Sequence, residues 1–106
     1  MKCIHAAGSS KNGQIAAKLV WSYFVKNVDD TYNLTLKDIE DVDIYQVWHC
    51  YILGNEKWLL STTYHDGMYY EVTYNKAKDE WYFDAYQKVK NIKVSSDIID
   101  NLFLTV

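Results

Sequence analysis

The most regular pattern of apolar and polar positions lies near the N-terminus, in residues 14–26. The polar residues of this stretch recur at every fourth position, along one narrow stripe of a helix: Gln14, Lys18, Ser22 and Lys26. The residues between them are apolar, so the predicted helix is apolar over more than half of its circumference, whereas a surface helix needs only about 100°. We therefore expect either a curved sheet that wraps the helix or a dimer contact on one of its flanks.

The start of this helix is indicated by two serines. Either Ser9 or Ser10 can accept a hydrogen bond from the first free amides as an N-cap, so the helix is predicted to begin near Lys11. A short strand over residues 2–7 is predicted before it. Residues 28–43, after the helix, are predicted to form a loop with one short helical turn.

Four runs rich in Tyr, Trp, Val and Ile follow, and turn residues separate them, so each run predicts a β-strand. The runs cover residues 43–53, 57–64, 68–75 and 80–89. The last segment, residues 97–103, has the apolar spacing of a short helix or of a closing segment. We expect this segment to cover an edge of the core.

Alternation along the runs predicts which side chains face the helix, because neighbouring residues of a strand point to opposite faces. A three-residue loop, 65–67, keeps the second and third runs in phase, with Tyr64 opposite Met68 and with Gly67 in a left-handed conformation. The residues predicted to face inward are Trp58, Leu60, Thr62, Tyr64, Met68, Tyr70, Val72, Tyr74, Trp81, Phe83 and Ala85.

The first run has two possible orientations, which differ in the turn that follows it. A two-residue turn, Gly54-Asn55, directs one set of side chains inward, and a three-residue loop, 54–56, directs the other. The set that faces inward with the longer loop is Ile44, Gln46, Trp48, Cys50 and Ile52. We prefer this second orientation because it buries more apolar surface.

The predicted fold class is α+β, in a single domain over residues 1–106. A long N-terminal helix packs on a curved, four- to five-stranded antiparallel meander, and a short C-terminal helix or strand follows. The element order β-α-β-β-β-β over residues 2–89 resembles the cystatin-like arrangement, in which a sheet curls around one helix. Cystatins inhibit cysteine proteases through a Q-x-V-x-G hairpin and a Pro-Trp pair. The hairpin here reads L-G-N-E-K and the chain has no proline, so the resemblance implies a fold and not protease inhibition.

Composition and charge narrow the range of partners. The chain has no arginine, and so it lacks the planar fork that pairs with phosphates and guanine edges; direct nucleic-acid binding is not expected. The net charge is −3. Its acidic residues are concentrated after the helix, in either a solvated loop or a patch for a basic partner: Asp38, Glu40, Asp41 and Asp43.

The location is predicted from what the chain lacks. No apolar stretch is long enough to span a membrane, and the N-terminus has no secretory h-region, so we expect a cytoplasmic protein without membrane contact. The abundance of Asn, Ile, Lys and Tyr is typical of AT-rich genomes. It favours a low-GC bacterium or one of its mobile elements.

No catalytic residues, cofactor site or metal site is predicted. The histidines lack ligand spacing, and His49 and Cys50 are strand neighbours that point to opposite faces. Residues 8–13 have the G-x-x-x-x-G spacing of a phosphate loop without its Lys-Ser/Thr, so they either cap the helix or hold an anion. Glu71 and Asp84 should both face outward on adjacent strands, and we expect the register to keep these carboxylates apart, with tyrosines between them.

The remaining feature is a set of tyrosines expected on the outward face of the sheet, interleaved with small polar residues, Glu71 and Asp84. The set is Tyr45, Tyr51, Tyr69, Tyr82 and Tyr86. Aromatic rings with polar neighbours are typical of binding surfaces.

These observations favour a non-enzymatic protein-binding module, such as a phage or mobile-element inhibitor of a host protein, of the anti-CRISPR or anti-restriction type. One alternative is a small-ligand or enzymatic domain with a pocket between sheet and helix, lined by Trp48, Tyr70, Tyr74 and Trp81. A homo-oligomeric structural domain is the other.

Overall fold

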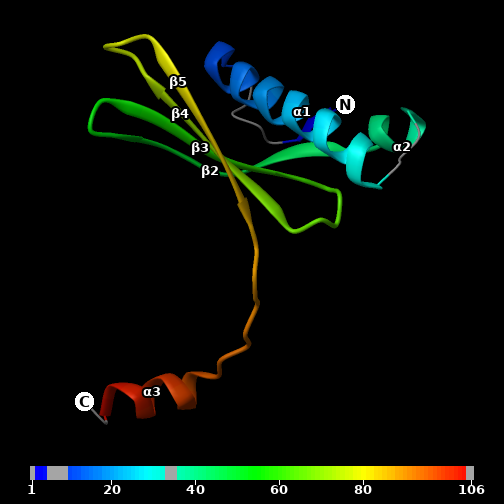
Figure 1. Ribbon diagram of the computed structural model, residues 1–106. Coiled ribbons are helices and arrows are strands. Elements are labelled where there is room, and N and C mark those ends of the chain that lie inside the picture. The colour runs from blue at the N-terminus through cyan, green and yellow to red at the C-terminus, as the bar shows by residue number, and fades with distance from the viewer. Residues whose placement is uncertain (1, 5–9, 33–35, 105–106) are drawn as a thin grey trace.

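The computed structural model describes residues 2–4, 10–32 and 36–104 and shows an α+β fold (Figure 1). Its elements are, in chain order, β1 (Lys2–Ile4), α1 (Lys11–Tyr32), α2 (Leu36–Glu40), β2 (Asp43–Ile52), β3 (Asn55–Thr62), β4 (Met68–Asn75), β5 (Glu80–Gln87) and α3 (Ser96–Leu104). None of the described helices combines the length and the apolar character needed to cross a membrane.

The strands form one open sheet in the order β1-β2-β3-β4-β5. Strands β2 to β5 are antiparallel, as predicted, whereas β1 pairs with β2 in parallel. The prediction of an all-antiparallel meander is therefore wrong for β1. The reason is the connection: α1 carries the chain back along the sheet before β2 begins, as a crossover between parallel strands must. The rest of the predicted strand over residues 2–7 lies outside the described residues.

Helix α1 begins where the serines predicted it. The Ser10 hydroxyl accepts a hydrogen bond from the Gly13 amide at 3.0 Å, so Ser10 is the N-cap. The helix continues beyond the predicted apolar pattern, to Tyr32. The polar stripe faces solvent, and the opposite side is buried through Ala16, Ala17, Val20 and Phe24.

Most side chains predicted to face inward do pack against α1. Trp58, Leu60, Tyr70 and Val72 form the core with the helix, and the partly buried Met68, Tyr74, Trp81 and Phe83 surround them. Tyr64 packs against Phe24 in a second cluster. Ala85 is exposed. It follows that α1 does not cover the β5 edge of the sheet at this position.

The β2–β3 hairpin differs from both predicted orientations. Its turn is Leu53-Gly54, with φ angles of 50° and 79°, as a type I′ turn requires. The register also shifts between Gln46 and Trp48, where Val47 forms a β-bulge. A bulge adds one residue and reverses the alternation.

Because of this reversal, the side chains of the second half of β2 point to the opposite side of the sheet from the one that regular alternation would give them. Ile44 and Gln46 face α1, as predicted. Beyond the bulge, His49 pairs with Trp58 and Tyr51 pairs with Glu56, so His49 and Tyr51 share the helix side. The prediction that Trp48, Cys50 and Ile52 face inward is therefore wrong: these three side chains point away from α1.

The β3–β4 hairpin has the predicted faces with a longer loop. Gly67 has the predicted positive φ, 71°. Ser61 pairs with Tyr69, so the loop spans residues 63–67 and Tyr64 is not opposite Met68. Thr63 instead pairs with Asp43, through an amide-to-carbonyl bond of 2.9 Å and a hydroxyl that accepts from the Asp43 amide. The shift is two residues, so the faces are unchanged.

The C-terminal segment, predicted as a short helix or strand, forms the helix α3, but it does not cover an edge of the core. Residues 88–101 are exposed, and Figure 1 shows α3 standing away from the sheet at the end of an extended segment. The expectation that this segment closes the core is wrong, because the extended segment carries α3 beyond the sheet.

The Leu53-Gly54 turn generates a stability prediction. Leucine is strained at positive φ by about 1–2 kcal/mol, and asparagine tolerates this conformation. Leu53→Asn should therefore raise the free energy of unfolding by about 1 kcal/mol, measured by guanidinium denaturation. The matched control is Leu53→Ile, whose β-branched side chain should lower it. Equal stability of the two variants would contradict the type I′ assignment.

Candidate functional site

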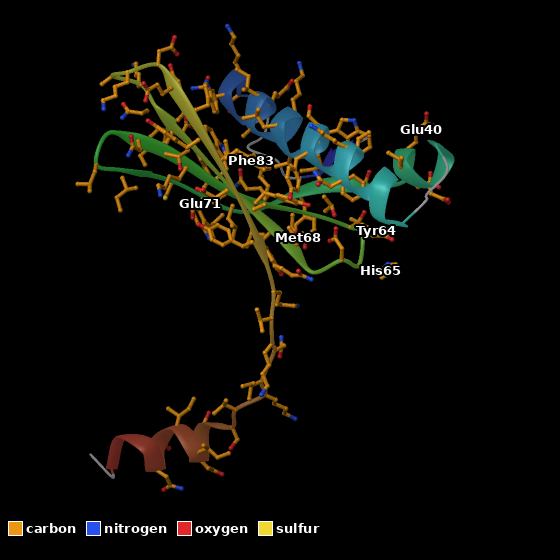
Figure 2. All side chains as sticks on the ribbon, viewed as in Figure 1. Glu40, Tyr64, His65, Met68, Glu71 and Phe83 are labelled. Atoms are coloured by element: carbon orange, nitrogen blue, oxygen red, sulfur yellow. The ribbon has the colours of Figure 1, made fainter. Side chains whose placement is uncertain are left out.

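The first candidate is the face of the sheet that points away from α1, called here the outer face. The strand register places its side chains in rows across β2, β3, β4 and β5. One row is Tyr45, Ser61, Tyr69 and Tyr86; the next is Trp48, Leu59, Glu71 and Asp84; the third is Cys50, Lys57, Thr73 and Tyr82. Figure 2 shows Glu71 on this side and Phe83 on the side of α1.

Four large side chains of the outer face are well exposed. Tyr86 is 51% exposed, Tyr82 48%, Ile52 51% and Trp48 37%. Two further tyrosines, Tyr45 and Tyr69, are half-buried. The structure thus brings four of the five predicted tyrosines together on one face, with a tryptophan that the sequence-based prediction had placed inside.

The two carboxylates of the outer face lie directly opposite each other. Glu71 pairs with Asp84 across β4 and β5, so the expectation that tyrosines separate them is wrong. The Lys57 ammonium lies 3.1 Å from Glu71 Oε1 and offsets the repulsion between like charges. This ammonium explains why the register tolerates the pair.

The exposed Tyr82 interacts with a neighbouring side chain of β5 at the edge of the outer face. Its hydroxyl donates a hydrogen bond to Glu80 Oε2. This hydrogen bond, together with desolvation and the negative charge of Glu80, raises the pKa of Tyr82. The phenol therefore stays protonated, and it presents a neutral ring to a partner.

The remaining predicted partner-binding residues do not belong to one surface. Tyr51 faces the side of α1 and is 75% exposed, because the bulge reversed this part of β2. Asp38, Glu40 and Asp41 lie on or just after α2, which packs through Ile39 on Phe24 of α1. The acidic residues in this group are Asp38, Glu40, Asp41 and Asp43; only Asp43 adjoins the outer face, at the start of β2.

The second candidate is a cavity on the helix side, at the N-terminal end of α1. It has a volume of about 300 Å³ and is lined by Asn12, Tyr51, Gly54, Glu56, Tyr74 and Lys76. Of the four side chains predicted to line a pocket, only Tyr74 does so. Tyr70 is in the core, 1% exposed, and Trp48 is on the outer face.

A buried carboxylate forms one wall of this cavity, called here the Glu56 cavity. Glu56 is 8% exposed. Its Oε1 accepts a hydrogen bond from Asn12 Nδ2 at 3.2 Å, and its Oε2 lies 2.7 Å from His49 Nε2. A hydrogen bond to Glu56 and then the carboxylate charge raise the pKa of Tyr51. Glu56 therefore joins α1 to the β2–β3 hairpin.

Stacked rings lie behind the Glu56 cavity. Ring centroids are 5.3 Å apart between His49 and Trp58, 5.8 Å between Trp58 and Trp81, and 4.5 Å between Trp81 and Tyr74. Trp58 Nε1 is buried with no hydrogen-bond partner among the described residues. The rings fix one side of His49, so its imidazole is held against Glu56.

A comparison with protein families gives a match over residues 13–96, which is most of the chain. The matching model is described as a family of unknown function, DUF6275. The chain belongs to this family. No curated protein and no solved structure matched the chain. The DUF6275 match extends from the first turn of α1 to the start of α3, and so it includes both candidate sites apart from Asn12.

The sequence features considered for metal and anion binding are the His, Cys and acidic side chains and residues 8–13, which the structure describes in part. No group of three or more His, Cys, Asp and Glu side chains could hold a metal ion among the described residues. Of the predicted phosphate-loop segment, residues 8 and 9 lie outside the described residues, and Ser10 caps α1. Cys50 is a free thiol, exposed on the outer face.

Sequence reasoning missed the His49–Glu56 pair. The two residues are seven positions apart and meet only because the hairpin turns at Leu53-Gly54 and a bulge precedes His49. Of the two orientations weighed for β2, the rejected one places His49 on the helix side. That orientation was the one available signal for this pair.

The Tyr51–Glu56 interaction predicts a change in titration. Glu56→Gln removes the carboxylate charge and weakens the hydrogen bond that favour the protonated phenol, so the pKa of Tyr51 should fall toward its ordinary value. NMR titration of the tyrosine ring carbons measures this change. Tyr74 is the internal control: Asp79 raises the pKa of Tyr74 through a hydrogen bond of 2.9 Å, and this pKa should stay raised. An unchanged Tyr51 pKa would refute the interaction.

Proposed function

We propose that the protein is a non-enzymatic protein-binding module that uses the outer face as its docking surface. One observation carries the proposal: α1 covers one side of the four antiparallel strands, while the other side exposes Trp48, Ile52, Tyr82 and Tyr86. Exposed apolar patches with aromatic residues and a polar surround are typical of interaction sites.

The proposed partner is a host protein, and the proposed role is inhibition by a phage or mobile-element product, of the anti-CRISPR or anti-restriction type. The small size, the acidic net charge of −3 and an amino-acid composition typical of AT-rich genomes support this role. The negative charge favours a basic surface on the partner. A cytoplasmic location and the cystatin-like element order are parts of the same proposal.

The face can be tested with exposed tyrosines on opposite sides of the sheet. The tagged chain is used to capture a stoichiometric partner from a low-GC bacterial lysate, and the affinity of that partner is then measured for single variants. Tyr82→Ala or Tyr86→Ala should weaken binding by about 30-fold, which corresponds to roughly 2 kcal/mol for an interface hot spot.

The matched control for this test is Tyr51→Ala, because Tyr51 is exposed on the helix side. It should leave the affinity within about 2-fold of the parent, since non-contacting surface changes have small effects. Loss of binding in Tyr51→Ala, with full binding in the two outer-face variants, would refute the proposed docking surface.

A second candidate function is supported by the Glu56 cavity: binding of a small organic cation. The buried Glu56 carboxylate could accept an ammonium group, and the rings of Tyr51 and Tyr74 line the same cavity. Aromatic faces and a carboxylate together favour cationic ligands.

Butylamine, which is protonated at neutral pH, and uncharged butanol are matched probes for this site. Butylamine should shift the NMR signals of Tyr51 and Tyr74 in a saturable way, and butanol should not. Glu56→Gln should abolish the saturable shifts. Equal shifts with both probes would exclude a cation site.

A further inference from the structure

The C-terminal arm, defined as residues 88–104, exposes a large apolar surface. Exposed fractions are 95% for Val89, 65% for Ile92, 47% for Val94, 53% for Ile98 and 41% for Ile99. Figure 1 shows the arm leaving the end of β5 and carrying α3 away from the rest of the molecule. Apolar side chains gathered on one projecting segment are typical of a segment that packs on another surface.

The start of the arm is held in line with the sheet. The Lys88 amide donates a hydrogen bond to the Gly67 carbonyl at 2.7 Å, which extends β5 past its last residue. Residues 88–95 then contain three β-branched apolar residues and neither glycine nor proline, so they favour an extended chain over a reversal. Fully extended, this segment spans about 26 Å. It therefore directs α3 away from its own sheet.

The outer face is complementary to this arm in polarity, and to its extended segment, residues 88–95, in charge; the two acidic residues of the arm lie on α3. It offers the apolar Trp48 and Ile52, with the rings of Tyr82 and Tyr86. It also carries Asp84, which has no ion-pair partner among the described residues, beside Glu71. The extended segment of the arm contributes the positive charges that such a face would attract: Lys88, Lys90 and Lys93.

We propose that two copies of the chain exchange their arms, so that α3 and the lysine-bearing segment of each copy lie on the outer face of the other. The proposal rests on the proposed function, because it requires the outer face to be a protein-binding face. The arrangement is a closed two-fold dimer in which each contact occurs twice. A stable interface takes roughly 20–30 residues from each side, which the arm and the outer face together can supply.

Arm exchange also gives the outer face a regulator. A host protein that docks on the outer face competes with the arm of the second copy. The dimer is then the resting form and the monomer the binding form. The apparent affinity of the protein for a partner should therefore fall as the protein concentration rises, because a larger share of the chains is then dimeric.

Disulfide trapping tests the exchange in the full chain. Cys50 supplies a thiol on the outer face, and Ile98→Cys supplies one on the apolar side of α3, in a Cys3→Ser background. Mild oxidation should give a covalent dimer on a non-reducing gel. Asp100→Cys, on the polar side of α3, is the matched control and should crosslink at least about 10-fold more slowly, since geometry limits which thiols can join.

Two results would overturn the exchange. A disulfide formed within one chain, which runs as a monomer on the gel, would place the arm on its own sheet. A light-scattering mass of one chain for the unmodified protein, with no crosslink, would show that no dimer forms.

A disruptive variant separates this proposal from the proposed function. Ile98→Asp combined with Ile99→Asp should convert the dimer to a monomer and should strengthen partner binding, because the competitor has been removed. If the unmodified protein is a monomer, the arm exchange is overturned, and the proposed docking surface is not affected by that result. A dimer that crosslinks as expected supports the exchange. If the affinity of the captured partner is then unchanged by Tyr82→Ala and Tyr86→Ala, that partner does not dock on the outer face.

Discussion

The packing of one helix against one side of the sheet is the constraint on which the other features depend. Ala16 and Ala17 allow α1 to approach the strands closely, and Val20 is buried in the same core cluster as Trp58. A single helix covers a single face. The opposite face therefore keeps its aromatic side chains in solvent, and the edge beside β5 stays open.

The periodic parts of the fold could be predicted from the sequence, and the irregular parts could not. Alternation and helical spacing predicted α1 and the four antiparallel strands and left α3 open as a helix or strand, and local chemistry predicted a cap by Ser9 or Ser10 and the left-handed Gly67. The bulge at Val47 has no marker, because its neighbours include neither glycine nor proline. Leu53 in a left-handed conformation contradicts local preference and is imposed by the pairing of β2 with β3.

The same difference explains which parts of the candidate sites were predicted. Tyr82 and Tyr86 lie on a regular strand, and simple alternation placed them on the outer face. Tyr51 and Trp48 follow the bulge, so each was assigned to the wrong side. The Glu56 cavity depends on four segments that meet only in the folded chain: the first turn of α1, the end of β2, the start of β3 and the end of β4. No local sequence pattern predicts that these segments come together.

The central claim is that the bulge at Val47 divides β2, so that His49 and Tyr51 lie on the helix side and Trp48 and Ile52 lie on the outer face. Nuclear Overhauser contacts between assigned side chains test it most directly, because cross-strand neighbours lie within about 5 Å. The account predicts contacts from the His49 ring to the Trp58 ring, and none from the Trp48 ring to the Trp58 ring. Contacts from Trp48 to Trp58, with His49 in solvent, would show an unbulged strand and would contradict the assignment of both surfaces.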